Sequence, residues 1–148
     1  MKIKLTVSRE RYAELEAQLE ALGIEIDNSS DLVLSEENRY TDFIMGRKDG
    51  AFSPVPADDI IFIETFGNEV VMHTLENTYN ISERLIRLEG LLNPHDFLRV
   101  SNSVIVAVKL IRKIRPTFSS KYILTLKDGS TVDVTRSYFT RFKDFFGL

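Results

Sequence analysis

The chain has 148 residues, no cysteine, 43% hydrophobic residues and 28% charged residues. This composition is typical of a globular protein with room for one core, or for a domain with a small appendage. The absence of cysteine excludes thiolate catalysis, cysteine-ligated zinc and disulfides. No apolar run resembles a signal peptide or approaches the ~18 residues needed to span a bilayer, so we expect a cytoplasmic protein.

The net charge of −3 is unevenly distributed along the chain. Residues 1–42 hold five Lys/Arg and ten Asp/Glu, a net −5, whereas residues 43–148 hold fourteen and twelve, a net +2. Within 97–143 there are ten basic side chains and two carboxylates. Local charge density governs attraction to phosphates, so this segment suits a polyanion, although a solvated basic face gives the same pattern.

Residues 1–42 predict a small acidic strand–helix–strand unit. Such a unit buries too little surface to be very stable alone. We therefore expect it to mediate dimerisation, to contact a partner, or to extend the core of the rest of the chain. Its predicted elements are a strand at 3–7, a helix with an apolar stripe over 12–22 that Ser8 caps and Gly23 ends, and strands at 24–27 and 32–34.

From residue 43 to 148 the pattern changes to short strands and tight turns. Asp49-Gly50 and Gly67-Asn68 are typical hairpin turns, and Pro54 and Pro56 indicate a loop. The predicted strands are 60–63, 70–72, 104–114 with a bend near Lys109, and the hairpin 122–126 and 131–134 around Asp128-Gly129.

Two helices are predicted in this second part of the chain. Apolar residues at helical spacing indicate a helix over 79–92, with Ser82 as its cap and Asn93-Pro94 as its end. Aromatic residues every three to four positions over 138–146 indicate a short amphipathic helix.

The segment 97–106 places an arginine and a polar turn, Ser101-Asn102-Ser103, directly before a β-branched apolar strand. About thirty residues later Lys127-Asp128-Gly129 turns the chain towards Val134-Thr135-Arg136-Ser137. Both segments put polar side chains that can contact DNA bases on loops at strand ends. Arginine can donate twice to guanine, and asparagine can pair with adenine, each pair being worth about 1–3 kcal/mol of discrimination.

These segments resemble, in order and spacing, the LytTR DNA-binding domain of bacterial transcription regulators. The resemblance covers about 44–148. It rests on the segments 59–65, the leucines of the 85–92 helix, 97–100 with 103–106, 126–129 and 134–138.

The resemblance implies a mainly β, elongated, antiparallel multi-sheet fold with short helices, preceded here by the strand–helix–strand unit. It also implies that loops between strands, rather than a recognition helix, enter successive major grooves of double-stranded DNA. Carried over to this sequence, Asn102 and Arg136 are expected to contact bases, with Ser101 and Ser103 beside Asn102 and with Asn68 in a third contact region. We expect phosphate contacts from four basic residues, Lys109, Arg112, Lys113 and Arg115.

Each assignment has a structural alternative. Asn102 could simply cap the local backbone of its turn, Arg136 could pair with Asp133, and Arg99 could be structural. The positions of Ser101, Glu69 and Ala107 often hold basic, imidazole or amide side chains in the family. A protein–protein interaction module with weak or lost DNA affinity is therefore the alternative function.

The resemblance to a LytTR regulator without a receiver domain suggests further partners. We expect a homodimer on promoter repeats, and a regulatory membrane protein that sequesters the chain is a candidate partner. We expect no cofactor, metal or small-molecule substrate and no enzyme activity. The two histidines lie in unrelated contexts, and the sequence has no Gly-rich phosphate loop, nucleophile elbow or His-Glu metal pair.

Overall fold

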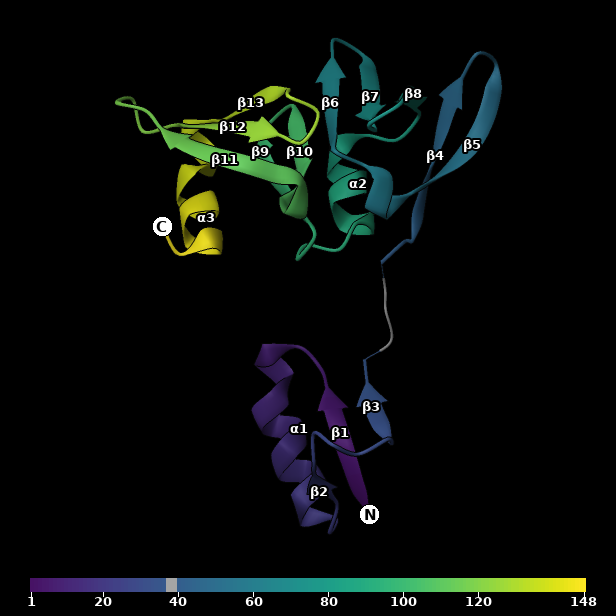
Figure 1. Cartoon of the computed structure of the whole chain (residues 1–148), viewed down its shortest axis with the longest axis vertical. Helices are drawn as coiled ribbons and strands as arrows, with labels where there is room; N and C mark the ends of the chain where they lie inside the picture. Colours follow the sequence, from purple (N-terminus) through teal and green to yellow (C-terminus); the bar gives the residue numbers. More distant parts are fainter. Residues whose placement is uncertain (37–39) are drawn as a thin grey trace. The chain divides into compact units, whose positions relative to one another are not determined.

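The computed structural model describes residues 1–36 and 40–148 (Figure 1). The chain divides into two compact units, Met1–Arg39 and Tyr40–Leu148. Thr41 and Asp42 belong to the second unit because their backbone groups hydrogen-bond to Leu91 and Ala57. No helix in the described part of the chain is both long and apolar enough to cross a membrane.

The first unit is a parallel sheet with one helix. Strand β1 (Lys2–Thr6) lies between β2 (Glu25–Ile26) and β3 (Val33–Ser35) and runs parallel to both. Helix α1 (Arg9–Ala21) connects β1 to β2. The strand–helix–strand pattern is present, and Gly23, with φ of +76°, follows the helix.

The core of this first unit is small. Ile3 and Leu5 of β1 are buried, whereas α1 has no buried residue. Leu22, expected in the apolar stripe, is 75% exposed because the helix ends before it. Ser8 occupies the N-cap position without a capping hydrogen bond from its side chain, and its N–H donates to Glu36.

The larger sheet of the second unit, within residues 40–148, has seven antiparallel strands in the order β5-β4-β8-β7-β6-β10-β9. These strands are β4 (Phe43–Lys48), β5 (Ala51–Pro56), β6 (Phe62–Phe66), β7 (Glu69–His73), β8 (Thr78–Ile81), β9 (Phe97–Ser101) and β10 (Val104–Ala107). The turns at Asp49-Gly50 and Gly67-Asn68 join β4 to β5 and β6 to β7, as predicted. The φ angles of Asp49, Gly50 and Gly67 in these turns are positive.

The remaining strands form a second antiparallel sheet. Its strands are β11 (Ile111–Pro116), β12 (Tyr122–Leu126) and β13 (Thr131–Val134), in that order. The bend expected near Lys109 is a 3₁₀ turn, Val108–Leu110, that separates β10 from β11. The predicted hairpin of 122–126 with 131–134 has the register Tyr122 to Val134.

Helices α2 (Leu85–Leu91) and α3 (Arg136–Phe146) complete the unit, together with the 3₁₀ turn Ala57–Asp59. Strands β6, β9 and β10 contribute apolar residues to both faces of the sheet. Alternate residues of these strands, such as Ile63 and Ile105, pack with Leu85 and Leu88 of α2. The intervening residues, such as Phe62 and Val106, pack with β12, β13 and Phe142 of α3 in a second core.

Two local predictions for this unit were wrong. Pro54 and Pro56 lie in β5 rather than in a loop, and the strand tolerates them because β5 is an edge of the sheet. The helix predicted over 79–92 begins only at Leu85, with Arg84 rather than Ser82 at the N-cap position, because 78–81 pairs with β7 as β8. The mainly β, antiparallel multi-sheet fold with few helices is as expected.

Candidate nucleic-acid interface

The predicted contact segments come together at one end of β10. Asn102 and Ser103 form a two-residue turn between β9 and β10, in which Ser101 faces Val104. The N–H of Thr135, the residue before Arg136, donates to the carbonyl of Val100 on β9. This bond brings the start of α3 next to the polar turn, although more than thirty residues separate them in the sequence.

An open hollow, which we call the polar hollow, lies between these segments. Asn102, Ser103 and Arg136 all line it, as do Thr135, Ser137 and Lys121. Asn102 and Arg136 are exposed. The sequence-predicted base contacts from two separate loops therefore share one surface.

Lys121 was not among the predicted contact residues, yet it lines the polar hollow. The signal was present in the predicted hairpin. Because Tyr122 pairs with Val134, the residue before Tyr122 lies across from Thr135 and next to Arg136. A register assigned to the hairpin from the sequence would have placed this cation beside Arg136.

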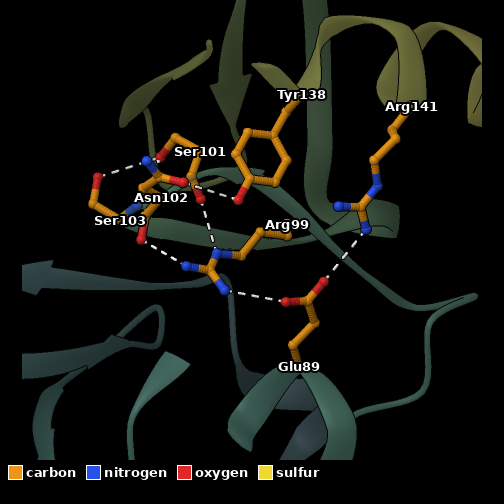
Figure 2. Close-up of polar contacts among 7 residues, drawn as sticks. All are labelled: Glu89, Arg99, Ser101, Asn102, Ser103, Tyr138 and Arg141. Atoms are coloured by element: carbon orange, nitrogen blue, oxygen red, sulfur yellow. Dashed lines mark hydrogen bonds and ion pairs between the residues drawn. The ribbon is translucent and has the colours of Figure 1, made fainter. Parts of the chain in front are cut away.

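The backbone of the polar turn is held by Arg99, whose side chain is only 13% exposed. Its guanidinium donates to the carbonyl oxygens of Ser101, at 2.9 Å, and of Asn102, at 2.7 Å (Figure 2). A third bond, at 3.1 Å, joins it to the Glu89 carboxylate of α2. Arg99 therefore has the structural role that was the alternative for this residue.

Glu89 connects three elements of the unit. One carboxylate oxygen accepts from Arg99 of β9, and the other accepts from Arg141 of α3 at 3.3 Å (Figure 2). The Arg141 guanidinium also lies 5.5 Å from the centroid of the Tyr138 ring. No local pattern in the sequence indicates the role of this carboxylate, because its partners lie 10 and 52 residues away.

Ser101 supports the turn instead of facing solvent. It is 6% exposed, and its hydroxyl oxygen accepts from the Ser103 N–H at 3.2 Å. Ser101 nevertheless lines the polar hollow, as does the half-buried Ser103, so the DNA contacts expected of both residues stay predictions.

Asn68 lies in the exposed turn between β6 and β7. This turn is at the same end of the sheet as the polar turn, because β6 pairs with β10 through Glu64 and Val104, and the Thr65 N–H donates to Ser103. The third predicted contact region is thus adjacent to the first.

The four predicted phosphate contacts do not form one group. Lys109 follows the far end of β10 and donates to Asp58 at 2.9 Å, and this hydrogen bond raises the pKa of Lys109 above its ordinary value. Lys109 is thus paired with Asp58 and does not line the polar hollow. The other three, Arg112, Lys113 and Arg115, are exposed on β11 and form no ion pair with any residue that the structure describes.

Two carboxylates also line the polar hollow, Glu64 and Asp133. The Glu64 carboxylate hydrogen-bonds to His73, whose Nε2 lies 2.8 Å from Glu64 Oε1, and the His73 ring stacks on Phe62 with centroids 4.1 Å apart. His73 therefore takes part in the packing and hydrogen bonding of the sheet. Asp133 forms no ion pair with Arg136 within the described ranges 1–36 and 40–148.

Comparison with known proteins bears on this surface. The sequence model of the family described as "LytTr DNA-binding domain" matches residues 50–147. Sensory transduction protein LytT of Bacillus subtilis is 38% identical over 84 residues, which are 57% of this chain and 35% of that protein. Transcriptional regulatory protein LytR of Staphylococcus aureus is 29% identical over 123 residues, which are 82% of this chain and 50% of that protein.

A solved structure has the same fold. The LytTr DNA-binding domain of a putative methyl-accepting/DNA response regulator from Bacillus cereus superposes with a TM-score of 0.71 and 26% sequence identity. The match covers 73% of this chain and 99% of that domain. The chain spans only about a third to a half of the length of the curated relatives described above.

Proposed function

This chain belongs to the LytTr DNA-binding domain family, and we propose that it is a transcription regulator that binds double-stranded DNA sequence-specifically. Loops at strand ends enter the major groove, with Asn102 and Arg136 as the principal base contacts. The family is one of DNA-binding domains and not of enzymes.

The observation that carries this proposal is the polar hollow. Asn102 and Ser103 from one loop and Arg136 from another line the same open surface. Amide and guanidinium groups are suited to hydrogen bonding with base edges in the major groove. Arg136 makes no ion pair within the described part of the chain, so its five donor N–H groups are available to DNA.

Exposed cations of the same unit support the proposal. Lys121 lines the polar hollow and directly precedes β12. The three other cations, Arg112, Lys113 and Arg115, lie on β11, which pairs with β12. Such side chains orient a protein on the duplex through phosphate contacts without reading the sequence. With Lys121, Arg112, Lys113 and Arg115 as the phosphate contacts, four counterions would be released from the duplex.

A salt titration tests the proposal. Four phosphate contacts predict that the logarithm of the association constant falls with the logarithm of salt concentration with a slope of about −4. The measurement is fluorescence anisotropy on a duplex selected from randomised DNA, and a scrambled duplex of equal length is the control. Failure to select any duplex, or equal affinity for both duplexes, would contradict sequence-specific binding.

We further propose that the chain acts as a cytoplasmic homodimer on promoter repeats. Unit 1, Met1–Arg39, is the candidate for the dimer contact or for a contact with a regulatory membrane protein. Its three consecutive residues Leu32, Val33 and Leu34 are 54%, 57% and 40% exposed, and among the residues that the structure describes β3 pairs with β1 alone. An apolar edge strand of this kind is suited to pairing with another chain.

The same exposed strand is the observation that favours the second candidate function, a protein–protein interaction module with weak DNA affinity. Glu64 and Asp133 in the polar hollow also favour it, because carboxylates repel phosphates. A flat salt response, together with retained self-association, would support this second candidate over the first.

A further inference from the structure

The hydrogen bonds around the polar turn fix the side chain of Asn102 as well as its backbone (Figure 2). The Tyr138 hydroxyl of α3 donates to Asn102 Oδ1 at 3.0 Å. An asparagine amide has one acceptor oxygen and an NH₂ group with two donors. Because Tyr138 holds the oxygen, the NH₂ group is the free end of this exposed amide, and nothing in the described part of the chain accepts from it.

Both partners of this bond are held in place. The Asn102 carbonyl accepts from Arg99, which Glu89 binds in turn. Tyr138 is half-buried on α3, and Arg141, bound to the other oxygen of Glu89, lies against its ring. Glu89 thus connects the two sides of the Tyr138–Asn102 hydrogen bond, and the amide is oriented before any DNA is present.

This orientation determines which base edge Asn102 can read. A free asparagine pairs with adenine through both ends, accepting from N6 and donating to N7. That mode uses the oxygen that Tyr138 already binds, so adenine N6 would have to share this oxygen with the Tyr138 hydroxyl. Guanine presents two acceptors in the major groove, N7 and O6, which match an NH₂ donor.

We propose that Tyr138 is a positioning residue for base selection, which makes Asn102 a hydrogen-bond donor and so selects guanine over adenine at the base pair that Asn102 contacts. Arg136 in the same polar hollow also has donors only, so the surface as a whole favours acceptor edges. This inference rests on the proposed function of sequence-specific DNA binding.

The test uses the whole chain and a duplex selected from randomised DNA. The affinity of every single-base variant of that duplex is measured for the parent protein, Asn102→Ala, Tyr138→Phe and the control Tyr79→Phe, whose tyrosine packs on Gly46 outside the polar hollow. Asn102→Ala identifies the base pair that Asn102 reads.

At that base pair the parent is expected to prefer guanine. Tyr138→Phe is expected to lower the preference for guanine over adenine about fivefold, the effect of one net hydrogen bond. In Tyr138→Phe we expect no change in the base preferences at other positions, in the salt slope or in the unfolding midpoint. We expect the control Tyr79→Phe to have the base-preference profile of the parent. A merely structural role of Tyr138 would instead weaken binding to all duplexes alike.

Two results would overturn the inference. One is a parent preference for adenine at this base pair, and the other is an unchanged base profile in folded Tyr138→Phe. If that variant does not fold, a duplex with 7-deazaguanine at this position replaces it, because this base lacks the N7 acceptor of guanine. Equal affinity of the parent for the guanine and the 7-deazaguanine duplex overturns the inference. A lower affinity of the parent for the 7-deazaguanine duplex supports the inference if Asn102→Ala abolishes the difference. Absence of any selected duplex rejects the proposed function itself, so the two failures are distinguishable.

Discussion

Arg136 is the residue whose side chain most directly tests the proposed interface. It begins α3, is exposed and lines the polar hollow. We expect Arg136→Ala to weaken specific DNA binding by about 1–3 kcal/mol and to relax preference at one base pair, while the protein stays folded.

The control for this substitution is Lys143→Ala, which removes an exposed cation from the same helix but outside the polar hollow. It is expected to have the base profile of the parent. Equal affinity of Arg136→Ala and the parent for the selected duplex would reject the assignment, and circular dichroism verifies that both variants are folded.

At this scale the sequence indicates residues but not their surroundings. Asn102 and Arg136 were predicted as base contacts from the family resemblance, and both line the polar hollow, while their contact with DNA stays a prediction. Ser101 and Lys109 were also expected to contact DNA, but one is buried and the other is paired with Asp58. Burial and ion pairing depend on neighbours distant in sequence, which a local motif does not specify.

Glu89 connects α2 with β9 and α3, so its charge affects how three elements hold together. We expect Glu89→Gln to lower the free energy of unfolding by about 1–3 kcal/mol, since the largely buried Arg99 guanidinium loses its charged partner. Urea denaturation measures the change.

The matched control is Glu83→Gln. Glu83 pairs with Arg87 at 2.9 Å, but those side chains are 44% and 66% exposed, so solvent screens the pair. Its removal is expected to cost no more than about 0.5 kcal/mol. An equal loss of stability in both variants would contradict a special role for Glu89.

Gly46 in β4 leaves room for an aromatic ring of the neighbouring strand. A Cβ added there would lie 2.7 Å from the Cβ of Tyr79 in β8. We expect Gly46→Ala to destabilise the protein by about 1–3 kcal/mol, because the strands or the ring must shift.

Gly90→Ala in α2, where an added Cβ meets nothing within 4 Å, is expected to stabilise the helix by up to about 1 kcal/mol. Thermal denaturation of the pair tests both expectations, and a stable Gly46→Ala would show that the ring yields easily.

Elements with strong local signals were predicted well. The turns at 49–50, 67–68 and 128–129 and the aromatic helix near the C-terminus are present. The 79–92 segment was predicted poorly because apolar spacing suits a helix, whereas pairing with β7 makes its first residues a strand. Position in the sheet likewise decides that Pro54 and Pro56 are tolerated in β5.

Considered as a whole, the molecule combines a small unit with exposed apolar residues and a DNA-binding domain. If β3 mediates the proposed dimer, Val33→Lys is expected to lower the dimer fraction, because a charge on an edge strand opposes pairing. Sedimentation velocity measures the fraction. Leu75→Lys, at a position 58% exposed in the second unit, is the control and is expected to leave self-association unchanged. An unchanged dimer fraction in Val33→Lys would show that β3 does not form the dimer contact.

The strands that carry the polar turn, β9 and β10, contribute apolar residues to both cores of the second unit. Their opening would disrupt two packed layers at once, so they belong to the part of a fold that opens last. A turn anchored on such strands has little freedom left to lose when a duplex binds. If this turn contacts DNA as proposed, recognition resembles the fit of a rigid template more than the folding of a loop onto its target, and the entropic cost of association is correspondingly low.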